Sequence, residues 1–226
     1  MPEPRSLPLV RSPTRAQLIR FDLRYGLPTA LGALRQHLSK GRLLAVLASY
    51  LLRSLRDPLR HIPRTGWDPH RETLVRHQLR AAVLIDDALR AASGLAETDR
   101  RTALADVISR TGAAFIAANV PMPTAAAWRG AREADRDRYA LTVVERFFNA
   151  EVQDVDASAE HFAFDVSRCR FVELCAALDR PDLAPLFCAA DSVFFERPDA
   201  PLKLVRANTL ATRGPRCDFR FHPQES

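Results

Sequence analysis

Hydrophobic residues in the first two thirds of the chain recur at the three- and four-residue spacing of amphipathic helices. From Arg15 to about residue 62 this pattern is interrupted near Gly26-Leu27-Pro28 and at Gly41, where we expect breaks in the helix. The proline-rich residues 1–14 are expected to form an extended or flexible lead-in.

Three later segments carry the same spacing. The first has a clear start, because Asp68 suits an N-cap and Pro69 the first helical position, and Gly94 suits its C-terminal end. The sequence therefore predicts a helical bundle over residues 15–150. Its later helices are expected at about residues 68–94, 98–119 and 131–149.

The pattern changes after Asn149, and residues 161–166 alternate between apolar and polar side chains as a strand does. The C-terminal region, residues 151–226, is expected to be a small antiparallel sheet packed with helices, which places the chain in the α+β class. A turn is expected at Thr212-Arg213-Gly214-Pro215. Strands are expected at about residues 161–166, 202–210 and 216–221, and helices at about 168–178 and 182–196.

The composition is that of a soluble globular protein, with 47% hydrophobic and 27% charged residues. Arginine supplies 31 of the 33 basic residues, which favours a GC-rich bacterial genome. The net charge of +6 is uneven, because residues 1–80 hold 15 basic residues and 5 acidic ones. Such a surface could meet nucleic acid, an acidic partner or a membrane. No basic run or known nucleic-acid-binding motif is present, so we expect no nucleic-acid partner.

The longest apolar run, residues 43–52, has ten residues and is too short to cross a bilayer, which takes about 20. Because the N-terminus also lacks the pattern of a signal peptide, we expect a cytoplasmic protein with reduced cysteines. Arginines flank the run, so residues 42–60 could dock on an anionic membrane or a protein partner, and salt would abolish that binding. More often such a helix belongs to the core and its arginines are solvated, which is the interpretation we favour.

Candidate chemistry is concentrated in the last quarter of the chain, where cysteines lie among acids and arginines. Ser167 suits an N-cap, which would place Cys169 in the first turn of a helix. There the helix dipole and the neighbouring Arg168 favour a thiolate. Glu173, four residues further on, would share a helix face with Cys169.

Two more cysteines follow at regular positions. Cys188 and Asp191 are three residues apart and share a face of the next expected helix. Cys217 alternates with two phenylalanines on the last expected strand, and Asp218 then points to the opposite face. A free cysteine among apolar neighbours is usually a small core residue, and the carboxylates could simply pair with arginines.

Other signals in the sequence are weaker. His161 opens the strand that leads into the cysteines and could act as a general base. Three cysteines could bind zinc, but they lack a close C-x₂₋₄-C pair, so no metal or other cofactor is expected. The chain has no phosphate loop, dinucleotide fingerprint or G-x-S-x-G elbow.

Taken in order, these residues resemble the C-terminal signature of the L-2-amino-thiazoline-4-carboxylic acid hydrolase family. The resemblance covers about a quarter of the chain well, and several elements occur in the expected order. They are Arg168-Cys169 with Glu173, Cys188-Ala-Ala-Asp191, Arg206 with Thr209, and Gly214-Pro-Arg-Cys217-Asp218-Phe219-Arg-Phe221.

Members of that family add water to a cyclic isothiourea, 2-amino-thiazoline-4-carboxylate, and so open its ring. The resemblance implies a hydrolase for a small heterocycle of this kind, or for another cyclic amidine, lactam or imine. It implies Cys188 as nucleophile and Asp191 as proton-transfer group, although Cys169 with Glu173 fits nearly as well. The substrate would be held by Arg206 or Arg168 at its carboxylate, and by Thr209, Cys217, Asp218 and His161.

The closing Cys-Asp-Phe motif is also loosely similar to small ligand-binding domains of the 4-vinyl-reductase type. This similarity gives an alternative, a non-catalytic module that holds a small molecule or a metal ion. The state of the thiols separates the two hypotheses. The hydrolase needs an exposed cysteine of low pKa, whereas structural or zinc-bound thiols would be inert to alkylation.

Overall fold

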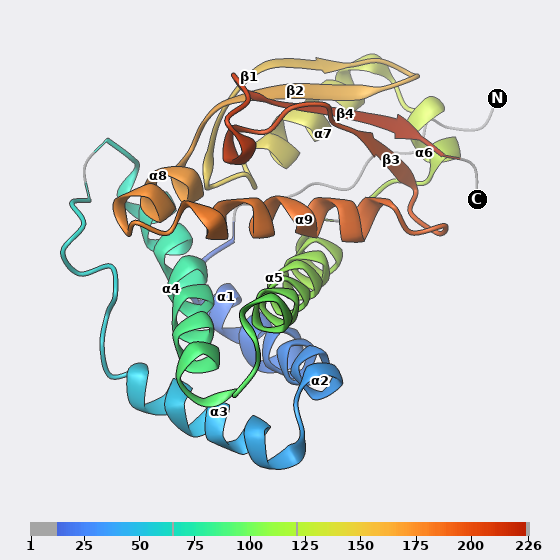
Figure 1. Cartoon of the computed structure of the whole chain (residues 1–226). Coiled ribbons are helices and arrows are strands. Elements are labelled where there is room, and N and C mark those ends of the chain that lie inside the picture. Colours follow the sequence, from blue (N-terminus) through green and yellow to red (C-terminus); the bar gives the residue numbers. More distant parts are fainter. Residues whose placement is uncertain (1–12, 65, 121, 225–226) are drawn as a thin grey trace.

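The computed structural model describes residues 13–64, 66–120 and 122–224, and Figure 1 shows a small sheet resting on a body of helices. The helices before the sheet are α1 (Arg15–Phe21), α2 (Leu27–His37), α3 (Lys40–Arg53), α4 (Pro69–Ala92), α5 (Glu97–Asn119), α6 (Ala125–Arg129) and α7 (Glu133–Val144). The strands are β1 (Ala150–Ala157), β2 (Phe162–Cys169), β3 (Leu202–Val205) and β4 (Cys217–Pro223), and between β2 and β3 lie α8 (Arg170–Ala177) and α9 (Ala184–Phe195). The predicted α+β class is confirmed.

The first helical rod is longer than expected, because the predicted break near Gly26 is wrong. A π-helical turn, Asp22–Gly26, joins α1 to α2, and Gly26 itself has helical angles (φ −62°, ψ −55°). Pro28 lies in the first turn of α2, where the wider preceding turn accommodates its missing N–H. The chain reverses instead at Leu38, whose backbone is extended (φ −124°, ψ 138°).

Two residues of the expected lead-in, Pro13 and Thr14, are described, and the rest of it lies outside the described residues. The hydroxyl of Thr14 accepts a hydrogen bond from the amide of Gln17 (3.2 Å) and caps α1. The expected division of the chain at residue 150 stays a prediction.

The predicted limits of α4 are confirmed. The carboxylate of Asp68 accepts hydrogen bonds from the amides of His70 (3.0 Å) and Arg71 (2.9 Å), and Pro69 follows as the first helical residue. Gly94, just beyond the helix, has a positive φ of 62°, a conformation that glycine adopts without strain.

The four strands form one antiparallel sheet in the order β1-β2-β4-β3. The hydrophobic pattern does not predict β1, whose register with β2 shifts at two points and whose Asp154 has a φ of 53°. These irregularities remove the even alternation by which a strand is recognised in a sequence. β3 is shorter than expected, and the chain reaches β4 through a long loop with a 3₁₀ turn at Leu210–Thr212 instead of the predicted tight turn.

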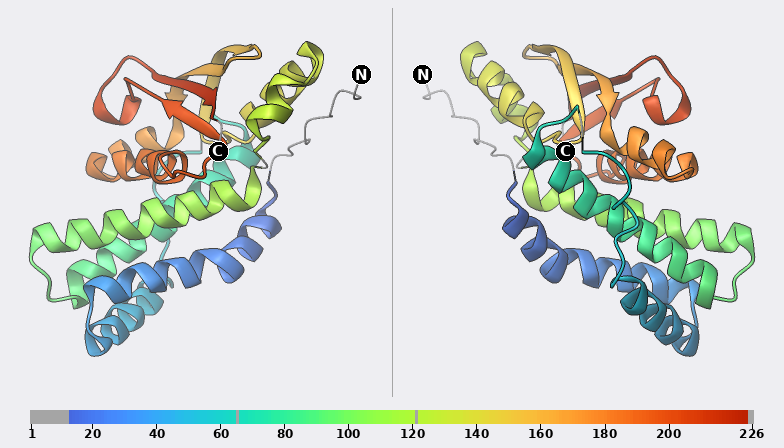
Figure 2. Two further views of the ribbon diagram at one scale, coloured as in Figure 1. Left: turned by 90° about the vertical axis from the view of Figure 1, so that its right-hand side faces the viewer. Right: turned by 90° about the vertical axis from the view of Figure 1, so that its left-hand side faces the viewer.

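The inner face of the sheet is aromatic. β2 and β4 pair Phe162 with Phe221 and Phe164 with Phe219, and the rings of the second pair stack at 4.8 Å. The side chains packed on this face come from α6, α7 and α9, and they include Trp128, Tyr139, Phe194 and Phe195. Figure 2 shows the ribbon of α9 (orange) between the sheet and the long helices α4 and α5 (green).

A second apolar cluster joins α2, α3, α4 and α5 to α8 and to the start of α9. Helix α9 crosses α5 beneath the sheet (Figure 1). At this crossing a Cβ on Gly112 would overlap the Cβ of Ala190, so only glycine lets the two helices approach so closely. Because Ala190 precedes Asp191, this contact also sets the position of the acidic residue on α9.

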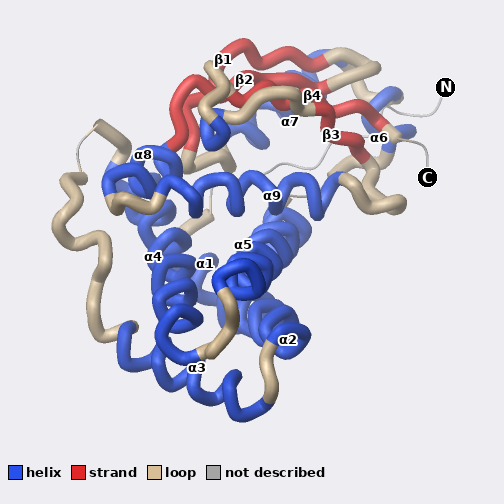
Figure 3. The backbone as a smooth tube through the Cα atoms, in the orientation of Figure 1, coloured by secondary structure: helices blue, strands red, loops and turns tan. Residues whose placement is uncertain are grey.

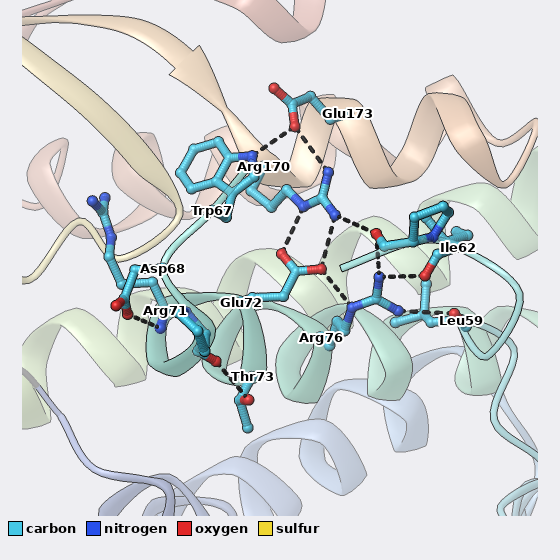
Figure 4. A network of polar contacts seen from close by, with 12 residues as sticks. Leu59, Ile62, Trp67, Asp68, Arg71, Glu72, Thr73, Arg76, Arg170 and Glu173 are labelled. Carbon is cyan, nitrogen blue, oxygen red and sulfur yellow. Dashed lines mark hydrogen bonds and ion pairs between the residues drawn. The ribbon is translucent and has the colours of Figure 1, made fainter. Parts of the chain in front are cut away.

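A buried ion-pair network joins the first and last parts of the chain (Figure 4). Glu72 on α4 is 1% exposed and lies between Arg76 (2.6 Å) and Arg170 (2.7 Å). Arg76 also donates to the carbonyls of Leu59 and Ile62 (2.8 Å each), which holds the segment after α3 against α4. Burial acts to raise the pKa of Glu72, but hydrogen bonds and charges from the two arginines outweigh it and hold that pKa below its usual value.

The network predicts a large loss of stability in Arg170→Met. The variant leaves the buried carboxylate of Glu72 with one arginine, and removing one partner of a buried ion pair costs about 3–5 kcal/mol. Urea unfolding at neutral pH measures the loss. The pKa of Glu72 is lowered by folding, so its stabilising contribution is present above about 4.5 and is lost as the pH falls through the folded value. The stabilities of variant and wild type should therefore converge in acid.

Arg101→Met is the matched control, because Arg101 is exposed and its bond to Glu97 (2.7 Å) lies at the surface. The control should change the free energy of unfolding by no more than about 0.5 kcal/mol. If Arg170→Met cost as little as the control, the network would not be a main source of stability.

The crossing of α5 and α9 predicts opposite effects for two glycine substitutions. Gly112→Ala should destabilise the protein by about 1–3 kcal/mol because the added methyl group overlaps Ala190. Gly32→Ala in α2, where a Cβ meets open space, should instead stabilise it by up to about 1 kcal/mol. Thermal unfolding compares them, and Gly112→Ala combined with Ala190→Gly should recover most of the loss. Equal effects of the two single variants would contradict this packing.

Candidate functional site

The structure brings together three of the four cysteines under the sheet, from three different elements. Cys169 ends β2, Cys188 lies on α9 and Cys217 begins β4. They are within electrostatic range, since a charge on Cys169 or Cys217 raises the pKa of Cys188. Cys175 is buried in the other apolar cluster, although a charge on Cys169, which borders both clusters, also raises its pKa.

An ion pair lies beside these thiols. Arg206, in the loop after β3, donates through Nη1 to the carboxylate of Asp191 (2.7 Å) and through Nη2 to the carbonyl of Cys188 (2.9 Å). Its guanidinium lies 5.0 Å from the centre of the Phe219 ring. The arginine thus ties the loop to the part of α9 that carries Cys188 and Asp191.

The acid of this pair is perturbed by its surroundings. Burial raises the pKa of Asp191 above its usual value, and the charge and hydrogen bond of Arg206 offset this only in part. A carboxylate of raised pKa is a stronger base than an ordinary aspartate. Such a carboxylate is suited to accept a proton from a neighbouring group.

The helix start expected at Ser167 is wrong, and with it the expected thiolate at Cys169. β2 continues to Cys169, which is itself the N-cap of α8 and has an extended backbone (φ −130°, ψ 118°). Burial raises the pKa of its thiol. The amides of Val172 and Phe171 and the side chain of Asn149, whose Nδ2 lies 3.7 Å from Sγ, lower that pKa only in part. Desolvation therefore outweighs the favourable helix N-terminus.

The other two thiols are also held in the neutral form. Burial and the charge of Asp191 raise the pKa of Cys188 to about 12. Burial likewise raises the pKa of Cys217, although the amide of Leu210 donates to its sulfur (3.2 Å). All three thiols are thus protonated at neutral pH.

Glu173 and Arg168 belong to the ion-pair network, and not to the ion pair that lies beside the cysteines. Glu173 accepts from Arg168 (2.8 Å), Arg170 (2.9 Å) and the indole of Trp67 (2.8 Å). Arg168 also bonds Glu151 (2.6 Å) and stacks on the Trp67 ring at 4.8 Å. Both side chains have full sets of structural partners.

Two more candidates stabilise the loop between β3 and β4. The carboxylate of Asp218 accepts a hydrogen bond from the amide of Asn208 (2.6 Å), and the hydroxyl of Thr209 accepts one from the amide of Thr212 (3.2 Å). Burial acts to raise the pKa of Asp218, but hydrogen bonds led by the Asn208 amide hold it below its usual value. These residues shape the loop that carries Arg206.

The structure does not bring His161 to the cysteines. His161 bonds Ser158 (2.9 Å) and pairs with Asp156 at the turn between β1 and β2. Cys169 lies at the other end of β2, on the order of 20 Å away at the usual rise of a strand. No proton transfer between the two is possible over this distance.

The sequence does not reveal two residues that contribute to the site. They are Asn149 and Phe219, whose ring contacts the guanidinium of Arg206. Asn149 lies in the loop before β1, where no periodicity marks it, and Phe219 is recognisable from the pattern only as a core residue. Within residues 13–64, 66–120 and 122–224, no three His, Cys, Asp or Glu side chains are placed to hold a metal ion together.

Comparison with known proteins identifies the family of this chain. A family model described as L-2-amino-thiazoline-4-carboxylic acid hydrolase matches residues 82–221. That range runs from α4 to β4, includes the three clustered cysteines with Asp191 and Arg206, and covers more than half of the chain. No curated protein and no solved structure matches the chain. The matched range is long enough to decide the family: the chain belongs to the L-2-amino-thiazoline-4-carboxylic acid hydrolase family.

Proposed function

We propose that this protein hydrolyses a small cyclic amidine, such as 2-amino-thiazoline-4-carboxylate, at the site formed by Cys188, Asp191 and Arg206. The observation that carries the proposal is a part-buried carboxylate of raised pKa that is paired with an arginine and lies three residues from a cysteine on the same helix. All three residues lie in the range that the family model matches. A thiol, a proton acceptor and a cation are the groups that attack on an amidine carbon requires.

The reaction starts from a protonated amidine ring and a neutral thiol. Cys188 Sγ attacks the amidine carbon while Asp191 takes the thiol proton, and the C=N electrons pass to the ring nitrogen. The carbon–sulfur bond of the ring then breaks, and the leaving sulfur takes the proton from Asp191. Water adds to the same carbon and displaces Cys188, giving a carbamoyl-cysteine and one released proton.

The raised pKa of Cys188 makes Asp191 essential to this scheme. A thiol with a pKa of about 12 supplies very little thiolate at neutral pH, so its proton must move during the attack. The raised pKa of the carboxyl and the raised pKa of the thiol are both due first to burial. The same dry surroundings would strengthen the attraction between Arg206 and an anionic substrate.

Arg206 is the best anchor for a substrate carboxylate. Its Nη2 donates to the neutral carbonyl of Cys188 (2.9 Å), and a carboxylate oxygen in that place would make a stronger, charge-assisted bond. Arg168 is less suited because two carboxylates already occupy it, those of Glu173 and Glu151.

One observation favours the second candidate, a non-catalytic module that binds a small molecule. The clustered thiols are protonated and largely buried, which is the usual state of structural cysteines. Such a module would bind a cyclic amidine without changing its mass.

Three cysteine-to-alanine variants test the proposed nucleophile. Purified protein is incubated with 2-amino-thiazoline-4-carboxylate and related cyclic amidines, and mass spectrometry follows the addition of one water molecule. Cys188→Ala should lower the rate by at least about a thousandfold, since it removes the nucleophile. Cys175→Ala, in the other apolar cluster, should keep it within a few fold. Full activity in Cys188→Ala with loss in Cys169→Ala would move the nucleophile, and binding without turnover by wild type would support the binding module.

The pH profile tests the role of the ion pair. We expect kcat/KM to rise with pH as Asp191 loses its proton, with a midpoint above the usual range of aspartate because burial raises that pKa. Arg206→Gln should move the midpoint to higher pH, because Arg206 lowers the pKa of Asp191, and should raise KM for substrates that carry a carboxylate. Arg101→Gln serves as control. An unchanged midpoint in Arg206→Gln would show that the rate does not depend on Asp191.

A further inference from the structure

Helix α3 has two apolar faces, and only one of them is covered. Leu43 and Val46 are buried against α4 and its neighbours. The leucines of the other side remain open, at 67% exposure for Leu44, 65% for Leu51 and 71% for Leu52, and Leu55 in the following turn is 85% exposed. The expectation that this segment is a core helix therefore holds for one side of α3. It does not explain why the other side is also apolar.

The open leucines form a continuous ridge. Leu44, Leu51 and Leu55 are spaced by seven and four residues, which places them along one line of a helix and its next turn. Figure 1 shows α3 at the edge of the molecule opposite to the sheet. Several exposed leucines side by side on a protein surface mark a site of interaction.

A basic hollow adjoins the ridge at the C-terminal end of α3. It has a volume of about 390 Å³ and is lined by Arg53, Arg56, Asp57, Pro58, Arg60, His61, Leu84 and Asp87. Arg53 donates to the hydroxyl of Ser49 (3.1 Å) and Arg60 to the ring of His61 (2.7 Å), so these bonds go to neutral groups. The charge of Arg53 also acts on the carboxylate of Asp87, whereas Arg56 and Arg60 are exposed and open to an anion.

The charge of this part of the chain selects the kind of partner. Residues 35–64 contain seven arginine or lysine residues and a single acid, Asp57. A second copy docked on the same face would bring two strongly positive surfaces together, which disfavours a dimer. A layer of phosphate groups above a hydrocarbon region matches both the arginines and the leucines.

We propose that α3 and the turn after it dock on an anionic phospholipid surface. The exposed leucines enter the boundary between head groups and acyl chains, and the arginines of the hollow bind lipid phosphates. No helix among the described residues is long and apolar enough to cross a membrane, so α3 lies along the surface. In this orientation the sheet (red in Figure 3) lies on the side of the molecule opposite to the lipid.

Co-sedimentation with vesicles tests the proposal, independently of any turnover. Wild type should bind phosphatidylcholine vesicles that contain phosphatidylserine, bind pure phosphatidylcholine vesicles much less, and be released by high salt. Arg56→Gln/Arg60→Gln and Leu51→Gln/Leu55→Gln should each lower the partition coefficient at least about tenfold, because each pair removes one of the two attractions.

Matched controls are Leu141→Gln on α7, a leucine that is also exposed, and Arg101→Gln on α5. Both should bind vesicles as wild type does. Absence of binding to anionic vesicles, or equal binding by the leucine variant, would overturn the proposal. A dimer in analytical ultracentrifugation that Leu51→Gln/Leu55→Gln dissociates would assign the ridge to a second copy instead.

Discussion

The buried carboxylate of Glu72 is the constraint on which the rest of this structure depends. It sits between Arg76, four residues away on the same helix, and Arg170, which is 98 residues away along the chain. The same two guanidinium groups also donate to the carbonyls of the segment after α3 and to the carboxylate of Glu173. Helices α4 and α8 and the segment between α3 and α4 are therefore fixed together. Since α8 follows directly from Cys169, the same network also sets where the cysteine cluster begins.

The helices could be predicted from the sequence wherever local signals decide them. Asp68, Pro69 and Gly94 act on their own helix ends, so the limits of α4 follow from the residues alone. The continuous rod across Gly26 and the strand β1 could not be predicted in this way. A π-helical turn and two register shifts break the periodicity on which such a prediction relies.

The sequence selected several residues that the fold brings near one another, but it did not predict their protonation states. Spacing and resemblance selected Cys169, Cys188 and Asp191, and the fold brings them together with Arg206. The expected thiolate failed because the helix dipole is a local effect, whereas desolvation depends on every element packed around the sulfur. Glu173 illustrates the same limit, because Arg168 and Arg170 lie close to it in sequence but its third partner, Trp67, is 106 residues away.

The burial of the thiols has a consequence for the lifetime of the protein. Oxidants attack the thiolate form of cysteine, and a thiol with a pKa of about 12 supplies about a thousandfold less thiolate at neutral pH than one at the ordinary value of 9.0. Peroxide and disulfide exchange should therefore spare Cys188 while the site is empty. A cysteine kept in the neutral form is preserved against oxidative damage, and in the proposed reaction it would become reactive only once its proton can pass to Asp191.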